Sequence, residues 1–344
     1  MKALFPTTDE SVILKEVEVP PIESGDLLIA MRSCGICGTD LEKVKGEAST
    51  PCVLGHEVVG EVVKVGDNVR AFSEGDRVFS HHHVSCGKCV YCLQGSETMC
   101  QWFTDTNLDP CGFSELFKVP SRNVDQGSTM KIPDSLDFDK ATFIEPLGCC
   151  IRAASRSRLK AGCTVAVVGC GPMGILNLMV AKAFGASKLV AIEVSDFRLS
   201  WAVKMGADLV VNPLENNASE MVKKFTGGMG VDLVILATSN PRAFTESFNI
   251  VRRGGSICLF GAPEKDLRVQ INLAKIFYDE ISIMSTYSTT ENETSTALKM
   301  LESKLIQPQD LITHRYDISD ASNAFRAATN ASESMKVVVT SRAR

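Results

Sequence analysis

The chain has 344 residues, enough for two domains of ordinary size, and 44% of them are hydrophobic, which excludes a disordered or collagen-like protein. Its 36 basic and 41 acidic residues give a net charge of −5, which argues against nucleic acid or an anionic membrane as the main partner. The sequence shows no secretory-signal pattern and no apolar run of the ~18 residues that span a membrane, so we expect a cytoplasmic protein without membrane partners.

The first part of the chain, up to about residue 150, reads as short strands separated by turns. β-rich runs occupy residues 12–14, 26–30, 58–65 and 76–79. Proline, glycine and polar residues between these runs supply the turns. The pattern predicts an irregular β domain over residues 1–150.

Four cysteines lie within fifteen residues of this β domain and indicate a metal site: Cys86, Cys89, Cys92 and Cys100. The odd total of 13 cysteines fits a disulfide framework poorly. Four thiolates from one short loop can close a tetrahedron around zinc and leave no open coordination position. We therefore predict a structural zinc in a lobe at residues 86–100, with four free thiols as the alternative.

Strands and helices alternate from about residue 151 to residue 285. Strands are expected at 164–168, 188–193, 208–211, 231–237 and 256–260, and helices at 173–184, 198–205, 219–225 and 244–251. This alternation predicts a parallel, doubly wound sheet, and therefore an α/β protein. In residues 286–344 we expect helices at 297–302 and 321–328, and a last strand at 336–340 that returns to the first domain.

A Gly-x-Gly-x-x-Gly motif joins the first strand of the alternating region to its first helix. Gly169 permits the tight turn, Gly171 lets the backbone approach a pyrophosphate, and Gly174 lets helix and strand pack closely. The alternative is a buried turn without a ligand. The motif predicts a dinucleotide site that also includes Pro172 and Met173.

Glu193 stands at the end of the next strand, 19 residues after the last glycine of the motif. A carboxylate there would accept hydrogen bonds from both ribose hydroxyls and repel a 2′-phosphate, so NAD is favoured over NADP. Arg198 is near enough to keep NADP open, although it could also pack beside the adenine as part of a helix face.

A second candidate metal site is spread along the chain: Cys37, His56 with Glu57, and Glu145. Their spacing alone does not identify a site, because a lone Gly-His-Glu is more often a structural histidine than a ligand. Six motifs in order, however, resemble the zinc-dependent medium-chain dehydrogenase/reductase (alcohol dehydrogenase) family over essentially the whole chain. They are GICGTD at 35–40, GHEVVGEV at 55–62, GDRV at 75–78, the four-cysteine lobe, EPL at 145–147 and the glycine motif.

The resemblance implies a GroES-like β-rich catalytic domain built from both ends of the chain, with a Rossmann domain inserted between them. The corresponding ranges are residues 1–150, 151–285 and 286–344. The family also implies an active-site cleft between the domains, closure over the cofactor, and a homodimer or homotetramer. Within the family, a glutamate rather than a cysteine at position 145 resembles the pattern of the polyol (sorbitol-like) and threonine dehydrogenase branch.

By the same resemblance, Cys37, His56 and Glu145 would surround a catalytic zinc, with Glu145 bound directly or through water. Glu57 would be an adjacent carboxylate able to approach or exchange onto the metal. Asp40 would orient His56. Such a zinc keeps one position open, where it lowers the pKa of a bound alcohol whose hydride then passes to nicotinamide.

The smaller roles in this site have structural alternatives. Thr39 would be the first carrier of the released proton, as its counterpart in the family is, or it caps a helix. Asp40 could likewise be an N-cap residue. His83 precedes the lobe as the corresponding histidine of threonine dehydrogenases does, where it borders the substrate, and a purely structural histidine is the alternative.

A pocket bordered by histidines and hydroxyls suits a polyhydroxylated substrate, because buried polar groups must be paired. We therefore expect oxidation of a secondary alcohol of a polyol, sugar or cyclitol to a ketone. L-Threonine 3-dehydrogenase activity is the alternative within enzymes. A non-catalytic, zinc-stabilised, dinucleotide-sensing protein is the alternative outside them.

Overall fold

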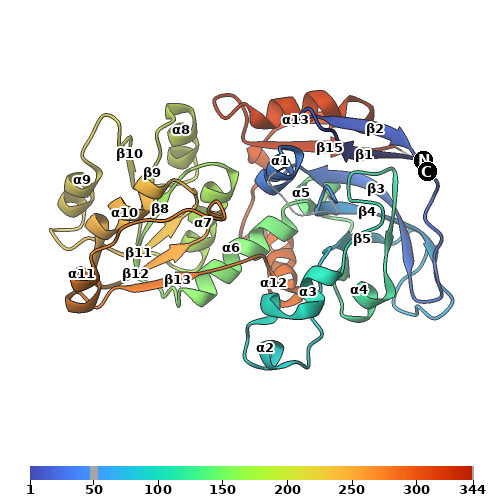
Figure 1. Cartoon of the computed structure of the whole chain (residues 1–344), viewed down its shortest axis with the longest axis horizontal. Helices are drawn as coiled ribbons and strands as arrows, with labels where there is room; N and C mark the ends of the chain where they lie inside the picture. The colour runs from blue at the N-terminus through green and yellow to red at the C-terminus, as the bar shows by residue number, and fades with distance from the viewer. Residues whose placement is uncertain (47–52, 343–344) are drawn as a thin grey trace. The chain divides into compact units, whose positions relative to one another are not determined.

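A computed structural model describes residues 1–46 and 53–342, and within it the chain forms two compact units (Figure 1). The first unit combines Met1–Gly148 with Thr289–Arg344, and the second is Cys149–Ser288. Helix α6 (Ile144–Arg156) contains the first boundary. None of the helices described is long and apolar enough to cross a bilayer.

Within the described residues, the first unit is built on a seven-stranded sheet in the order β14–β15–β3–β4–β5–β7, with β6 also paired to β3. The bounds are β3 (Leu27–Gly35), β4 (Glu57–Val65), β5 (Arg77–Ser80), β6 (Leu116–Val119), β7 (Thr129–Lys131), β14 (Ile312–Asp317) and β15 (Lys336–Thr340). β1 (Lys2–Pro6) and β2 (Val12–Glu16) form a separate antiparallel pair. The last strand, β15, pairs with β3 and so belongs to the sheet of the first unit.

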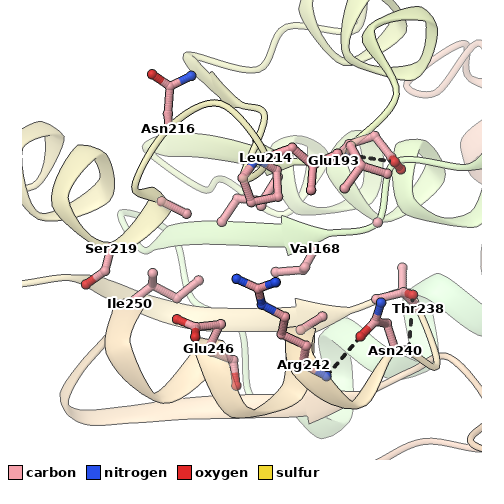
Figure 2. A pocket seen from close by; sticks show the side chains of 18 of the residues that line it. Val168, Glu193, Leu214, Asn216, Ser219, Thr238, Asn240, Arg242, Glu246 and Ile250 are labelled. Atoms are coloured by element: carbon pink, nitrogen blue, oxygen red, sulfur yellow. Dashed lines mark hydrogen bonds between the residues drawn. The ribbon is translucent and has the colours of Figure 1, made fainter.

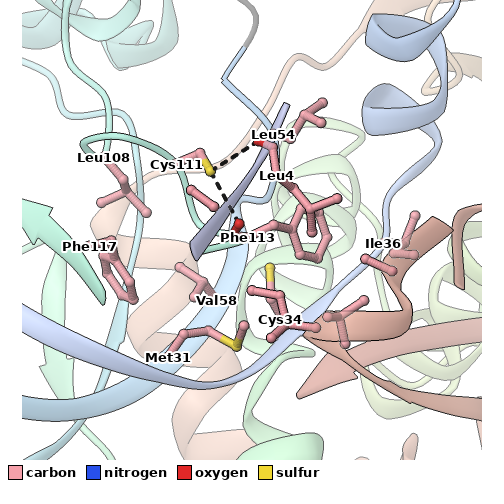
Figure 3. Packing of buried hydrophobic residues seen from close by; sticks show 14 of the residues in the cluster. Leu4, Met31, Cys34, Ile36, Leu54, Val58, Leu108, Cys111, Phe113 and Phe117 are labelled. Atoms are coloured by element: carbon pink, nitrogen blue, oxygen red, sulfur yellow. Dashed lines mark hydrogen bonds between the residues drawn. The ribbon is translucent and has the colours of Figure 1, made fainter. Parts of the chain in front are cut away.

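The core of the first unit gathers around β3, which is buried along almost its whole length. Figure 3 shows Met31 and Cys34 of this strand packed among side chains from distant parts of the chain, including Phe113 and Phe117. The ring of Phe113 also meets that of Phe325 edge-on at 5.5 Å, which attaches helix α13 (Ala321–Thr329) to the core. The buried strand therefore gives a rigid base to the residues that come directly after it.

Short helices surround this core: α1 (Gly38–Val44), α2 (Val90–Leu93), η1 (Glu97–Met99), α3 (Gln101–Asp105), α4 (Ser121–Asp125), α5 (Phe138–Ala141), η2 (Gln309–Leu311), η3 (Ile318–Asp320), α13 (Ala321–Thr329) and α12 (Glu291–Glu302). The predicted start of α12 at residue 297 is wrong, because the helix begins six residues earlier. The first turn of this helix is polar, so it shows none of the apolar spacing that predicts a helix. A capping box stabilises it instead, in which the Glu293 carboxylate accepts a 3.0 Å hydrogen bond from the Thr290 N–H.

The second unit confirms the predicted parallel sheet. In the part of the chain described, six parallel strands follow the order β10–β9–β8–β11–β12–β13. They are β8 (Thr164–Val168), β9 (Lys188–Ile192), β10 (Leu209–Val211), β11 (Val231–Leu236), β12 (Val251–Leu259) and β13 (Ser282–Ser285). The helices that connect them are α7 (Pro172–Ala183), α8 (Asp196–Lys204), α9 (Ala218–Phe225), α10 (Pro241–Ile250) and α11 (Leu273–Tyr278).

The predicted junction between a helix at 244–251 and a strand at 256–260 is wrong. β12 begins at Val251, directly after α10, and Gly254 and Gly255 lie inside the strand. The register against β11 shifts at this point, and Gly254 has a φ of +68°. The two glycines therefore allow a bulge within the strand rather than a break before it.

Candidate functional site

The end of β3 leads to Cys37 at the N-terminus of helix α1. Cys37 is the N-cap residue, with an extended backbone (φ −99°, ψ 157°). The carboxylate of Asp40, in the first turn, accepts a 3.0 Å hydrogen bond from the Cys37 N–H. Asp40 thus caps α1, but from the third helical position rather than as the N-cap. Thr39 is exposed, and its hydroxyl lies 3.8 Å from the Cys37 sulfur.

Asp40 also connects α1 to the segment that enters β4. Its other oxygen accepts a 2.8 Å hydrogen bond from the Gly55 N–H and lies 3.6 Å from Nδ1 of His56. Gly55 has a φ of +79°, and a Cβ there would lie 2.7 Å from the backbone nitrogen of Phe113, so only glycine fits. Burial would lower the pKa of His56, but Asp40 and Cys37 outweigh burial and raise it well above its usual value.

Cys37, His56 and Glu57 come together as a group of donors. Each offers one ligand atom, and these atoms lie within 4.8 Å of one another. Among residues 1–46 and 53–342, no hydrogen-bond partner is found for Glu57 Oε1, whereas His56 Nδ1 faces the Asp40 carboxylate. Buried polar atoms normally have a partner, and thiolate, imidazole and carboxylate are the ligands that zinc prefers in proteins. The donor set therefore fits a zinc ion.

Glu145, the other expected ligand, lies outside this group. It is buried in the first turn of α6. Its charge contributes to the raised pKa of Lys336, a residue that also contacts Glu57. The structure therefore places Glu145 near the donor group without making it a member.

Lys336 is not among the residues that the sequence predicts for the site. It is the first residue of β15 and only 3% exposed. Its ammonium group pairs with Oε2 of Glu57 and donates a 3.0 Å hydrogen bond to the carbonyl of Ile36. Burial would lower the pKa of Lys336, but Glu57 and Cys37 outweigh it and raise the pKa. The sequence feature that could have indicated a role for Lys336 is its place as a lysine directly before the apolar residues of this strand.

The three consecutive histidines occupy different positions relative to the donor group. The ring of His82 lies 5.1 Å from that of His56 and 3.7 Å from that of His83, measured between centroids. His83 Nδ1 lies 2.8 Å from the carbonyl oxygen of Thr106. Burial lowers the pKa of His81 to about 3 and that of His82 well below its usual value. The ring of His82 therefore adjoins that of His56, and because burial also lowers the pKa of His83, to about 4, all three consecutive histidines are neutral near pH 7.

The four cysteines of the lobe also converge, as their spacing predicts. Their sulfur atoms lie within 4.8 Å of one another, with Cys86 and Cys92 3.9 Å apart and Cys89 and Cys92 3.4 Å apart. Ligands 2.3 Å from a tetrahedral zinc lie about 3.8 Å from each other, so these separations fit. Backbone N–H groups of Lys88 and Cys89 lower the pKa of Cys86 to about 6, which favours its thiolate form.

The glycine motif has the geometry that its sequence predicts. Gly169 follows β8 with a φ of +89°, which side chains rarely adopt. A Cβ on Gly174 would lie 1.9 Å from the carbonyl oxygen of Gly169, so helix and strand could not pack this closely with any other residue. Gly171 is the N-cap of α7, and Pro172 and Met173 form its first turn. The helix N-terminus therefore offers unpaired N–H groups to an anion.

Glu193 and Arg198 line a cavity of about 680 Å³ beside this motif (Figure 2). Backbone N–H groups donate to the Glu193 carboxylate from Cys170 at 2.7 Å, from Val194 at 2.8 Å and from Ser195 at 3.1 Å. A carboxylate has about four acceptor sites, so roughly one remains for a ribose hydroxyl. Nη1 of Arg198 lies 3.9 Å from Oε2 of Glu193. The guanidinium also lies beside the glycine motif, since a Cβ on Gly171 would be 3.6 Å from Cζ of Arg198.

Comparison with known proteins identifies both units. Residues 23–134 match the family described as alcohol dehydrogenase GroES-like domain, and residues 172–303 match zinc-binding dehydrogenase. The sorbitol dehydrogenase of Bacillus subtilis is 32% identical over 98% of this chain and 97% of its own length. An L-threonine 3-dehydrogenase of Bacillus licheniformis is 33% identical over 94% of each chain.

Solved structures agree with this assignment. The alcohol dehydrogenase TADH from Thermus sp. ATN1 superposes with a TM-score of 0.89 at 27% identity, over 99% of this chain and 100% of the other. A zinc-binding dehydrogenase from Sinorhizobium meliloti bound to NADP gives a TM-score of 0.88 at 28% identity, over 98% of each chain. The chain therefore belongs to the zinc-dependent medium-chain dehydrogenase family, with a GroES-like and a Rossmann domain, and is an oxidoreductase that acts on CH–OH groups.

Proposed function

We propose that this enzyme oxidises a secondary alcohol of a polyol, sugar or cyclitol to a ketone and transfers the hydride to NAD. The observation that carries the proposal is the buried convergence of Cys37, His56 and Glu57 in a dehydrogenase of this family. Cys37 and His56 would hold a catalytic zinc, with Glu145 bound to it directly or through water and Glu57 as the adjacent carboxylate. The four cysteines of the lobe would hold a second, structural zinc.

The protein residues around the donor group would perform distinct tasks. When bound, the zinc acts as a Lewis acid that lowers the pKa of the substrate hydroxyl. Asp40 would orient His56, and the exposed hydroxyl of Thr39 would accept the released proton and pass it to solvent. His82, whose ring lies 5.1 Å from that of His56, would donate a hydrogen bond to a substrate hydroxyl, and His83, 3.7 Å from His82, would border the pocket.

NAD is the proposed acceptor because Glu193 would accept a hydrogen bond from the ribose and repel a 2′-phosphate. Replacement of Glu193 by glutamine is expected to lower the ratio of kcat/KM for NAD to that for NADP by about 10- to 100-fold, since hydrogen bonds to charged groups contribute about 1.5–3 kcal/mol. Steady-state kinetics with both cofactors measure this ratio, and Glu220→Gln, at an exposed position of α9, serves as the matched control. An unchanged ratio would contradict the assigned role of Glu193.

The substrate class is tested with purified, zinc-loaded enzyme and a panel of polyols, cyclitols, sugars, simple secondary alcohols and L-threonine. We expect the change in nicotinamide absorbance to be largest with one of the first three classes. L-Threonine is the second candidate, because relatives at 33% identity carry that activity. A clear preference for L-threonine would replace the polyol proposal, and a preference for simple alcohols would contradict both.

The enzyme is also proposed to form a homo-oligomer through the edge of its parallel sheet. β13 is the last strand in the order of that sheet, and Phe277 and Tyr278 of the neighbouring α11 are 75% and 72% exposed. An uncovered strand presents unpaired backbone groups, and a second copy offers the same edge for antiparallel pairing. We expect Ile283→Lys, in β13, to yield monomers in light scattering, whereas Leu305→Lys, an exposed leucine of the first unit, should leave the oligomer intact. Oligomers that survive Ile283→Lys would exclude this edge.

A further inference from the structure

Glu57 is a buried carboxylate that lies between an ammonium group and a group of potential metal-ligand atoms. One of its oxygens pairs with the ammonium group of Lys336, and the residue also belongs to the donor group with Cys37 and His56. Both side chains of the ion pair are almost completely buried, at 0% and 3% exposed. In such surroundings an unpaired charge is very costly, so Glu57 must always have a cationic partner.

Two cations would therefore compete for the same carboxylate once a metal is bound. If Glu57 moved fully onto the metal, it would fill a coordination position that an alcohol needs, since catalytic zinc sites keep one position open. If it stays with the ammonium group, that position remains free. We propose that Lys336 is the positioning residue that holds Glu57 back from the zinc and so keeps a coordination position available to the substrate. This inference rests on the proposed metal site.

The backbone around the pair is shaped to keep it in place. Gly35, the last residue of β3, is packed so tightly that a Cβ there would lie 2.0 Å from an oxygen of Glu57 and 2.8 Å from Cε of Lys336. The ammonium group is also anchored by its 3.0 Å hydrogen bond to the carbonyl of Ile36. These contacts attach Lys336 to the strand end that precedes Cys37, so its charge stays at a defined distance from the donor group.

The test is the rate at which a coloured chelator removes zinc from the holoenzyme. Zinc at two sites should be released in two kinetic phases. The phase that is present in the wild type and absent in Cys37→Ser is assigned to the proposed catalytic site. In Lys336→Met, we expect this phase to slow by roughly 10- to 100-fold, because the freed carboxylate of Glu57 becomes a permanent zinc ligand. Substitutions of residues that hydrogen-bond to metal ligands change metal affinity on this scale. In cobalt-substituted enzyme the d–d absorption bands of that site should weaken, as they do when coordination number rises, and kcat should fall.

The double variant Lys336→Met/Glu57→Gln distinguishes positioning from general damage. We expect fast zinc release to return in it, because the neutral amide binds zinc weakly, and we expect Lys336→Arg to behave like the wild type. Release from folded Lys336→Met at the wild-type rate or faster would overturn the proposal.

Glu57→Gln alone provides a measurement that does not need the lysine variant to fold. With Lys336 present, zinc release should change by less than about tenfold, because the glutamine amide oxygen can still accept a hydrogen bond from the ammonium group and the carboxylate is not a resident ligand. A tenfold acceleration would show that Glu57 already binds the metal and would overturn the inference. Absence of any Cys37-dependent phase in the wild type would instead overturn the metal site itself, and with it both proposals.

Discussion

Replacement of Cys37 by serine is expected to lower kcat/KM by at least about 1,000-fold and to remove one zinc per chain. The thiolate is a charged ligand at the N-terminus of α1, and the Lewis acid that it helps to hold accounts for several kcal/mol of transition-state stabilisation. Because Cys37 is only half-buried and α1 is capped by Asp40, the fold should survive the change. Steady-state kinetics together with metal analysis measure both effects.

Cys163→Ser is the matched control for this experiment, since that cysteine is also half-buried but lies just before β8, outside both groups of donors. It should retain zinc content and activity. Full activity in Cys37→Ser, or retention of both zinc ions, would contradict the assignment of the catalytic site.

The largest effect on stability is expected from Cys100→Ser in the lobe. Short helices and turns with few buried apolar side chains make up this segment, so bound zinc would replace a hydrophobic core there. Loss of one of four ligands should remove the structural zinc and lower the Tm by roughly 5–10 °C. Zinc analysis and thermal unfolding followed by circular dichroism provide the two measurements.

Met99→Ser changes the preceding residue, whose side chain is 50% exposed, and should leave zinc content and Tm unchanged. If Cys100→Ser kept two zinc ions per chain and the wild-type Tm, the lobe would hold no structural metal. The same Tm loss in Met99→Ser would show that the lobe is sensitive to any substitution rather than to loss of a ligand.

Features that depend on short stretches of sequence could be predicted directly. The positive φ of Gly169 and the close packing at Gly174 follow from local backbone geometry, which the spacing of the motif already contains. The convergence of the cysteines at 86–100 follows from the shortness of their loop. Cys37 and His56 needed the family resemblance, because nothing in their own spacing brings two elements together.

The remaining features depend on contacts between distant residues. Lys336 meets Glu57 only because β15 pairs with β3, a pairing for which the sequence has no local signal. At Gly254, two glycines look like a break between elements, and only the neighbouring strand shows that they form a bulge. The contact between the rings of His82 and His56 also depends on the fold, since the sequence does not give the direction of a side chain along this segment.

The place of β15 in its sheet has a consequence for folding during synthesis. The segment 149–288 contains every strand of the parallel sheet and can complete it while the ribosome is still translating the C-terminal residues. The first unit cannot do the same, because β15 is inserted between β3 and β14 and is made about three hundred residues after β3. Until then Glu57 lacks the ammonium group of Lys336, with which it pairs in the folded unit, and cannot be buried at low cost. A nascent chain that stops short of Lys336 is therefore expected to have a folded nucleotide-binding unit and an open, immature metal-binding region that the last strand closes.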